Sequence, residues 1–258
     1  MAVIRRCVTA MAQLSICTFG GFQARIRRAA TPLAFHTRKG MALTAYLAVC
    51  HTGSAGREQL AEMLWGGVAP EQSRHSVRQA ILDIRRTLGP DAGASLITTA
   101  DTARFDRTRL HVDVHRFERA LARDTPRSIA FACRLYRGDF LAGLHVREPA
   151  FDHWMLTERN RLKQLAAEAF QRRTEFLMTL DETAPALQVA LRLLDLDPFH
   201  EWAHRAVITI YARRSQIGAA RRHYDTFTKY LKDELDLDPE PETRELMRKI
   251  LRDRGGSN

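Results

Sequence analysis

Residues 70–88, PEQSRHSVRQAILDIRRTL, carry apolar side chains at the spacing of a helix. Val77, Ile81, Ile84 and Leu88 fall on one narrow stripe when successive residues are turned by about 100°, which is typical of a helix that rests on a core by one side. The opposite side of the same helix is polar and basic. The stretch therefore predicts an amphipathic helix with an exposed, positively charged face.

The exposed face of this expected helix carries side chains that can read DNA. Arginine and glutamine pair with guanine and adenine edges in the major groove, and an apolar tip can touch a thymine methyl group. A plain solvated surface is the alternative, because basic helix faces are common. The residues predicted to face the major groove are His75, Ser76, Arg78, Gln79, Leu82 and Arg86.

Positive charge is concentrated in the same half of the chain. Residues 1–112 hold 15 Lys or Arg against 7 Asp or Glu, whereas residues 113–258 hold 25 against 23. A surface that binds a polyanion needs such an excess, because neutralised phosphates release their counterions. The sequence has no run of about 18 apolar residues to span a bilayer, so nucleic acid is the expected partner rather than a membrane.

Length and composition fit a globular protein of two domains. The chain has 258 residues, of which 45% are hydrophobic and 27% charged. Its 4 cysteines are widely separated, with no CxxC pair, which indicates a reducing compartment and no disulfide framework or structural zinc site. The N-terminal apolar run is too short for a signal peptide, so we expect a cytoplasmic protein whose residues 1–12 are disordered.

The elements expected around residues 70–88 follow the order of a winged helix. Short strands are expected at 14–19, 22–26 and 32–35, two helices at 38–50 and 57–65, and a β-hairpin of residues 96–99 and 105–112 after the basic helix. In this fold the third helix enters the major groove, and the hairpin, or wing, approaches the DNA backbone or the minor groove.

Further basic residues are predicted to contact the DNA backbone from outside the third helix. Arg38, Lys39 and Arg74 are the predicted phosphate contacts, and Arg104, Arg107 and Arg109 are assigned to the wing. Each assignment competes with a plain solvated surface.

Residues 113–258 are expected to be all helical, with a repeat of 34 residues. This is the period of tetratricopeptide repeats, in which antiparallel helix pairs stack and form grooves for protein partners. A packed helical bundle with no groove in use is the alternative. The positions that recur are Phe170 and His204, Leu177 and Tyr211, Asp181 and Ser215, Ala186 and Ala220, Ala190 and Tyr224, and Leu193 and Phe227.

Residues 200–204, HEWAH, match the zinc-protease pattern H-E-x-x-H. Such an enzyme needs a third ligand on a neighbouring element and an open coordination position, and the candidates His223 and Glu234 carry no motif of their own. A zinc hydrolase is therefore a remote alternative. The sequence has no phosphate-binding loop and no nucleophile elbow, so we expect no catalysis and no cofactor.

Several segments resemble two domains of bacterial transcriptional activators of the SARP type. Those that resemble the OmpR-like winged-helix domain are RKGMALTAYLAV at 38–49, REQLAEMLW at 57–65 and SRHSVRQAILDIRRTLG at 73–89. VDVHRFERAL at 112–121 and YLKDELDLDPEPETRELMRKIL at 230–251 resemble the bacterial transcriptional activator domain that follows it in that family. The resemblance implies a DNA-binding domain at 13–112 and a tetratricopeptide-like activator domain at 113–258.

The resemblance also implies a function. It indicates a sequence-specific regulator, an activator, that binds double-stranded promoter DNA as a homodimer on direct repeats and contacts RNA polymerase. A protein-interaction scaffold that keeps the winged helix only as a packing module is the alternative, and it predicts no salt-dependent affinity for DNA.

Overall fold

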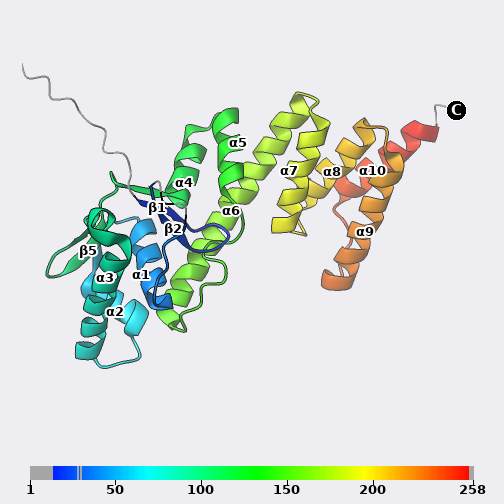
Figure 1. Ribbon diagram of the computed structural model, residues 1–258. Coiled ribbons are helices and arrows are strands. Elements are labelled where there is room, and N and C mark those ends of the chain that lie inside the picture. Colours follow the sequence, from blue (N-terminus) through cyan, green and yellow to red (C-terminus); the bar gives the residue numbers. More distant parts are fainter. Residues whose placement is uncertain (1–13, 28, 30, 256–258) are drawn as a thin grey trace, which may run out of the picture. The chain divides into compact units, whose positions relative to one another are not determined.

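The computed structural model describes residues 14–27, 29 and 31–255 and is mainly helical (Figure 1). Small strands occur among the helices before residue 113, and the described residues after it form helices and loops. This confirms the predicted fold class of a winged helix followed by an all-α, tetratricopeptide-like domain. Residues 1–12, predicted to be disordered, lie outside the described residues.

The first part of the chain contains the strands and helices expected of a winged helix. Thr37 ends the loop before the first helix and caps it, because its hydroxyl accepts a hydrogen bond of 3.0 Å from the Gly40 amide. In chain order the elements are β1 (Leu14–Cys17), β2 (Gln23–Ile26), α1 (Arg38–Val49), β3 (Ala55–Gly56), α2 (Arg57–Trp65), α3 (Pro70–Gly93), β4 (Leu96–Thr98), β5 (Thr102–Phe105) and β6 (Leu110–Val112).

The strands form two small sheets, in the orders β2-β1-β6 and β3-β5-β4. β1 pairs antiparallel with β2 and parallel with β6, so Leu14 lies opposite both Ile26 and Leu110. β4 and β5 form the antiparallel hairpin, with Leu96 opposite Phe105. The sheet around β1 thus joins residues that are almost 100 positions apart in the sequence.

Two predicted strands are wrong. The predicted strand 105–112 is split between β5 and β6, because the Asp106 carboxylate accepts hydrogen bonds from the Thr108 amide (2.9 Å) and hydroxyl (2.7 Å) and closes a turn. Residues 32–35 form no strand, although the Leu33 amide donates to Ala24 O at 2.7 Å.

β1 also ends earlier than the predicted strand 14–19, because the next two residues bind a side chain. The Asp113 carboxylate accepts hydrogen bonds from the Thr18 amide and hydroxyl, both at 2.7 Å, and from the Phe19 amide at 2.9 Å. Asp113 is 7% exposed, so these three donors satisfy a buried charge.

The chain forms two compact units whose limits differ from the division expected at residues 112 and 113. The first unit runs to Ala122 and includes Arg134–Leu162, and the second comprises Arg123–Cys133 and the chain from Lys163 onward. The boundaries between the two units fall within three helices, α4 (Asp113–Arg123), α5 (Pro126–Leu135) and α6 (Pro149–Thr179). Helix α6 therefore contributes to both units. The functional division at residue 112 stays a prediction.

In the first unit, an aromatic cluster joins α1 to α6. The Trp154 ring lies 4.9 Å from Tyr46, 5.7 Å from Phe140 and 5.3 Å from Phe151, measured between centroids. The Arg159 guanidinium fixes the preceding loop by donating to Phe140 O at 2.7 Å and to Leu141 O at 2.9 Å. Helix α1 of the winged helix therefore shares one core with the start of α6.

In the second unit the predicted repeat is confirmed by matching backbone geometry. Its further helices are α7 (Thr183–Leu196), α8 (Glu201–Arg213), α9 (Ile217–Leu235) and α10 (Pro241–Gly255). Asp181 and Ser215, 34 positions apart, both adopt left-handed conformations, with φ of 57° and 58°. Ala186 and Ala220 are fully buried at the positions where small residues were expected to let paired helices approach.

Candidate nucleic-acid interface

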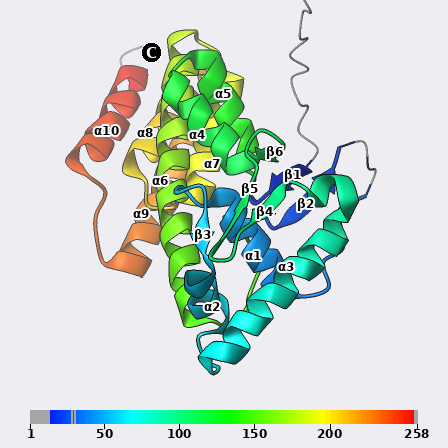
Figure 2. The same cartoon turned by 90° about the vertical axis from the view of Figure 1, so that its left-hand side faces the viewer.

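Helix α3 rests on α1 and α2 by the predicted apolar stripe. Val77, Ile81, Ile84 and Leu88 are all at most 3% exposed. Figure 2 shows α3 over its full length, with α2 beside its first turns. Helical geometry breaks at Gly89, where φ is 73°, before the chain continues through Pro90. The predicted helix of residues 70–88 is therefore confirmed.

The opposite face of α3 is exposed. His75, Arg78, Gln79 and Arg86 are exposed, Leu82 is 42% exposed, and Ser76 is half-buried. Among the residues that the structure describes, no hydrogen bond or ion pair engages the side chain of His75, Arg78 or Gln79. The structure thus places all six predicted base-reading residues on the solvent side of one helix.

Two arginines on α3 form exposed ion pairs. Arg86 Nη1 lies 3.1 Å from Asp83 Oδ1 on the same helix, and Arg74 Nη2 lies 3.7 Å from Glu58 Oε1 of α2. Exposed pairs of this kind contribute about 0–1 kcal/mol and are screened by salt. A phosphate group can therefore replace either carboxylate at small cost.

The two predicted phosphate contacts at the start of α1 differ in their surroundings. Arg38 is exposed, whereas Lys39 Nζ lies 2.6 Å from Glu148 Oε1 and 5.3 Å from the centroid of the Trp65 ring. Glu148 directly precedes α6, so an ion pair within the first unit already engages Lys39.

The structure separates the three arginines assigned to the wing. Arg104 is exposed on β5. Arg107 follows the hairpin, and its Nη2 donates to Cys50 O at 2.7 Å. Arg109 precedes β6, and its Nη2 lies 3.3 Å from Asp91 O. The hairpin turn itself contains Asp101, so of the three predicted residues the hairpin carries Arg104 alone.

Arg85 has a role that the sequence reasoning missed. Its Nη2 donates to Leu96 O at 3.0 Å and to Thr98 Oγ1 at 2.8 Å, which ties the hairpin to α3. The sequence offered one weak signal: Arg85 follows Ile84 of the buried stripe and so lies at the edge of the exposed face.

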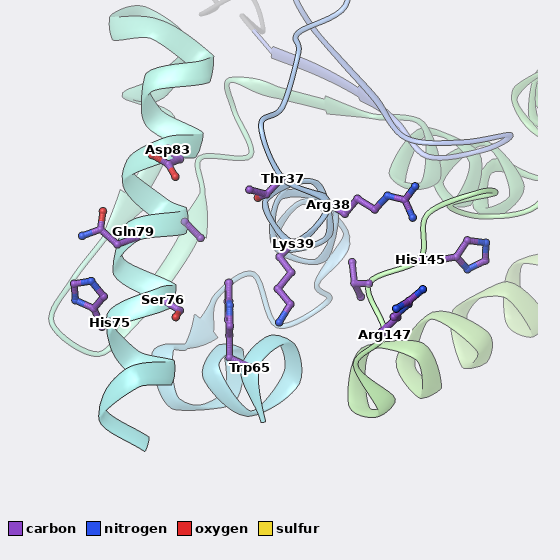
Figure 3. A pocket seen from close by; sticks show the side chains of 12 residues that line it. Thr37, Arg38, Lys39, Trp65, His75, Ser76, Gln79, Asp83, His145 and Arg147 are labelled. Carbon is purple, nitrogen blue, oxygen red and sulfur yellow. The ribbon is translucent and has the colours of Figure 1, made fainter. Parts of the chain in front are cut away.

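A pocket of about 510 Å³ opens beside α3 within the first unit (Figure 3). His75, Gln79 and Asp83 lie along α3 on one side, and Lys39 and Trp65 lie between that helix and the far side. The far side is basic, and the sequence reasoning missed the part that follows residue 112. It is formed by Arg38, His145, Val146 and Arg147.

Glu201 and His204 of the H-E-x-x-H motif are engaged in contacts within the second unit, whereas the buried Nδ1 of His200, just before α8, has no hydrogen-bond partner among the described residues. Glu201 accepts hydrogen bonds from the Glu240 amide (3.0 Å) and the Thr243 hydroxyl (2.6 Å). His204 Nε2 lies 2.9 Å from Pro198 O, and its Nδ1 lies 3.0 Å from His223 Nε2. No group of three or more residues that could hold a metal ion occurs in the described part of the chain.

The contacts of His204 fix the protonation of the histidine pair. The carbonyl requires a proton on His204 Nε2, so Nδ1 accepts a hydrogen bond from His223 Nε2. Burial, followed by the influence of His204, lowers the pKa of His223 to about 4. Burial also lowers the pKa of His204, so both rings are neutral near pH 7. The His204 ring stacks on Phe227 at 3.6 Å between centroids.

Comparison with known proteins finds similarity to a protein family and to a solved structure. Residues 100–251 match the family model of the bacterial transcriptional activator domain. The fold is similar to that of EmbR from Mycobacterium tuberculosis, solved in complex with a low-affinity phosphopeptide, with a TM-score of 0.70 and 23% identity. The match covers 93% of this chain and 65% of the EmbR chain. No protein of curated function matches the chain. Within the described residues, no helix is long and apolar enough to cross a membrane.

Proposed function

The chain belongs to the bacterial transcriptional activator domain family, and on that premise we propose that it regulates transcription by binding promoter DNA through α3. With a winged helix before this domain, it has the organisation of a SARP-type regulator. The third helix of a winged helix is the element that enters the major groove. Here that helix is α3.

One observation carries the proposal. α3 packs by a single stripe and leaves Arg78, Gln79 and His75 exposed and unengaged within the described chain. Side chains without protein partners need break no internal hydrogen bond before they contact a base edge. Arginine and glutamine are the residue types that pair bidentately with guanine and adenine.

The proposal includes the outcome and the partners that the resemblance implies. The regulator activates transcription, binds direct repeats as a homodimer and contacts RNA polymerase at the promoter. The proposal includes no catalysis by the zinc-protease motif, because Glu201 binds Glu240 and Thr243 and His204 binds Pro198 O instead. A protein that binds the bacterial chromosome works in the cytoplasm.

The test is a binding series with the full chain. The promoter region upstream of the chain's own gene is compared with an unrelated duplex of equal length from low to near-physiological salt. We expect a preference for the promoter that persists at the highest salt. Weak binding that is equal on both duplexes and vanishes with salt would contradict the proposal and favour the protein-interaction scaffold.

A further inference from the structure

The loop that leads into α6 presents two basic side chains beside α3. Val146 is 8% exposed and anchors the loop, while its neighbours His145 and Arg147 are exposed and line the pocket. Figure 3 shows both residues, with Arg38 of α1, on the side of the pocket opposite α3, with Lys39 and Trp65 between. The loop thus adds two basic groups from outside residues 13–112 to the surface next to the base-reading face.

The backbone of Arg147 is held in an unusual conformation. Its φ is 57°, in the left-handed region that side chains other than glycine rarely adopt. The next residue, Glu148, directly precedes α6, and its carbonyl accepts a hydrogen bond of 2.9 Å from the Asp152 amide. Strain of this kind persists where the surroundings enforce it, and it is concentrated at functional sites.

The positive charge at this side of the pocket is not neutralised. Within the described chain no carboxylate pairs with Arg38, His145 or Arg147. The two carboxylates close to the pocket already have partners, because Asp83 pairs with Arg86 and Glu148 with Lys39. The side of the pocket opposite α3 therefore carries two arginines that no carboxylate of the described chain neutralises.

We propose that Arg147, with His145 and Arg38, holds a phosphate of the DNA backbone while α3 lies in the major groove. This inference rests on the proposed function. His75 and Gln79 line the same pocket and belong to the base-reading face, so a duplex that meets this face brings its backbone next to the loop. An arginine guanidinium binds phosphate oxygens with two parallel hydrogen bonds, and such contacts set the register of a protein on DNA.

Glu148 opposes this phosphate contact. Its carboxylate lies 2.6 Å from Lys39 Nζ and is 15% exposed, so it holds the lysine and repels an incoming phosphate. Arg147 and Glu148 are adjacent in the sequence but act in opposite directions. Removal of the arginine charge weakens DNA binding, and removal of the glutamate charge strengthens it.

The experiment compares Arg147→Gly with wild type in the full chain. Glycine adopts a φ of 57° without strain, so the variant removes the side chain and keeps the loop. Arg119→Ala is the matched control, an exposed arginine on α4 that does not line the pocket. We expect Arg147→Gly to weaken binding about three- to tenfold on every duplex and to reduce the salt slope by about 1.

Phosphate-ethylation interference with wild type and Arg147→Gly locates the contact. Wild-type binding is expected to be blocked by ethylation at one or two phosphates per half-site that no longer matter for Arg147→Gly. Glu148→Gln is expected to strengthen binding several-fold and to steepen the salt slope. The proposal is wrong if Arg147→Gly and Arg119→Ala bind alike, with equal slopes and identical interference patterns.

The wild-type curve separates this inference from the proposed function. If wild type prefers the promoter and Arg147→Gly matches it, the loop inference fails and the proposed function stands. If wild type shows no preference for the promoter, the proposed function itself fails.

Discussion

Helices α3 and α8 both carry a row of polar side chains, but the fold treats the two rows differently. On α8, Glu201 and His204 bind a backbone amide, a hydroxyl, a carbonyl and a second imidazole. On α3, Arg78 and Gln79 are exposed and bind nothing within the described chain. A polar motif is available for function where the fold has not already satisfied its hydrogen bonds.

The largest expected effect is a loss of stability caused by a substitution on α8. We expect His204→Ala to lower the free energy of unfolding by about 2–4 kcal/mol, because it removes a buried ring and its two hydrogen-bonded contacts. Chemical denaturation measures the change. His75→Ala on α3 is the control and should leave stability within about 0.5 kcal/mol of wild type. Equal losses in the two variants would break the comparison.

The next effect is on DNA binding and belongs to α3. Arg78→Ala should cost about 1–3 kcal/mol of binding to the promoter and relax the sequence preference, with no change in unfolding. Fluorescence anisotropy on promoter and unrelated duplexes measures both quantities. Arg214→Ala, at an exposed position after α8, removes the same charge and should bind like wild type. A similar loss in both variants would show that only net charge matters.

Arg104 on the hairpin and Arg107 after it sharpen the same distinction between free and engaged side chains. Arg104 is exposed on β5, so Arg104→Ala should reduce the salt slope of DNA binding by about 1. Arg107 binds Cys50 O, so Arg107→Ala should instead cost about 1 kcal/mol of stability. Parallel salt titrations and denaturation curves test the pair. A reduced slope in both variants would restore the assignment of both residues to the wing.

A further expected effect is a dependence of stability on pH. Burial holds the pKa of His223 near 4, so the unfolded chain takes up a proton from about pH 6.5 and the folded chain only near pH 4. The contribution of His223 to the free energy of unfolding is therefore fully present above pH 6.5. It decreases as the pH falls from 6.5 toward 4. We expect Tm to be a few degrees lower at pH 5 than at pH 7, and His223→Gln to flatten this dependence. A Tm that rises on acidification would contradict the neutral histidine pair.

The sequence predicted the features that depend on local periodicity. The stripe of Val77, Ile81, Ile84 and Leu88 predicted which side of α3 is buried. The 34-residue period paired Asp181 with Ser215, and both adopt the left-handed conformation. Such patterns are visible because each residue's environment is set by neighbours three, four or 34 positions away.

Contacts between distant residues could not be predicted. The pair of Lys39 and Glu148 joins residues 109 positions apart, and neither has a motif that points to the other. The hairpin was placed wrongly because Asp106 closes a turn in a stretch with alternating apolar residues, where local bonding competes with strand pairing. Arg147 is likewise distant in sequence from α3, so no motif marked it as part of the candidate interface.

The parallel pairing of β1 with β6 has a consequence for synthesis on the ribosome. β1 is made first but cannot complete its sheet until Leu110–Val112 have left the ribosome. The amides of Thr18 and Phe19, which follow β1, have no hydrogen-bond acceptor until Asp113 has been made. The ring contact of Tyr46 with Trp154 forms later still, because Trp154 is made after Asp113. The nascent winged helix therefore matures only after part of the following domain is made, and a fragment cut after residue 112 keeps exposed apolar surface that favours aggregation.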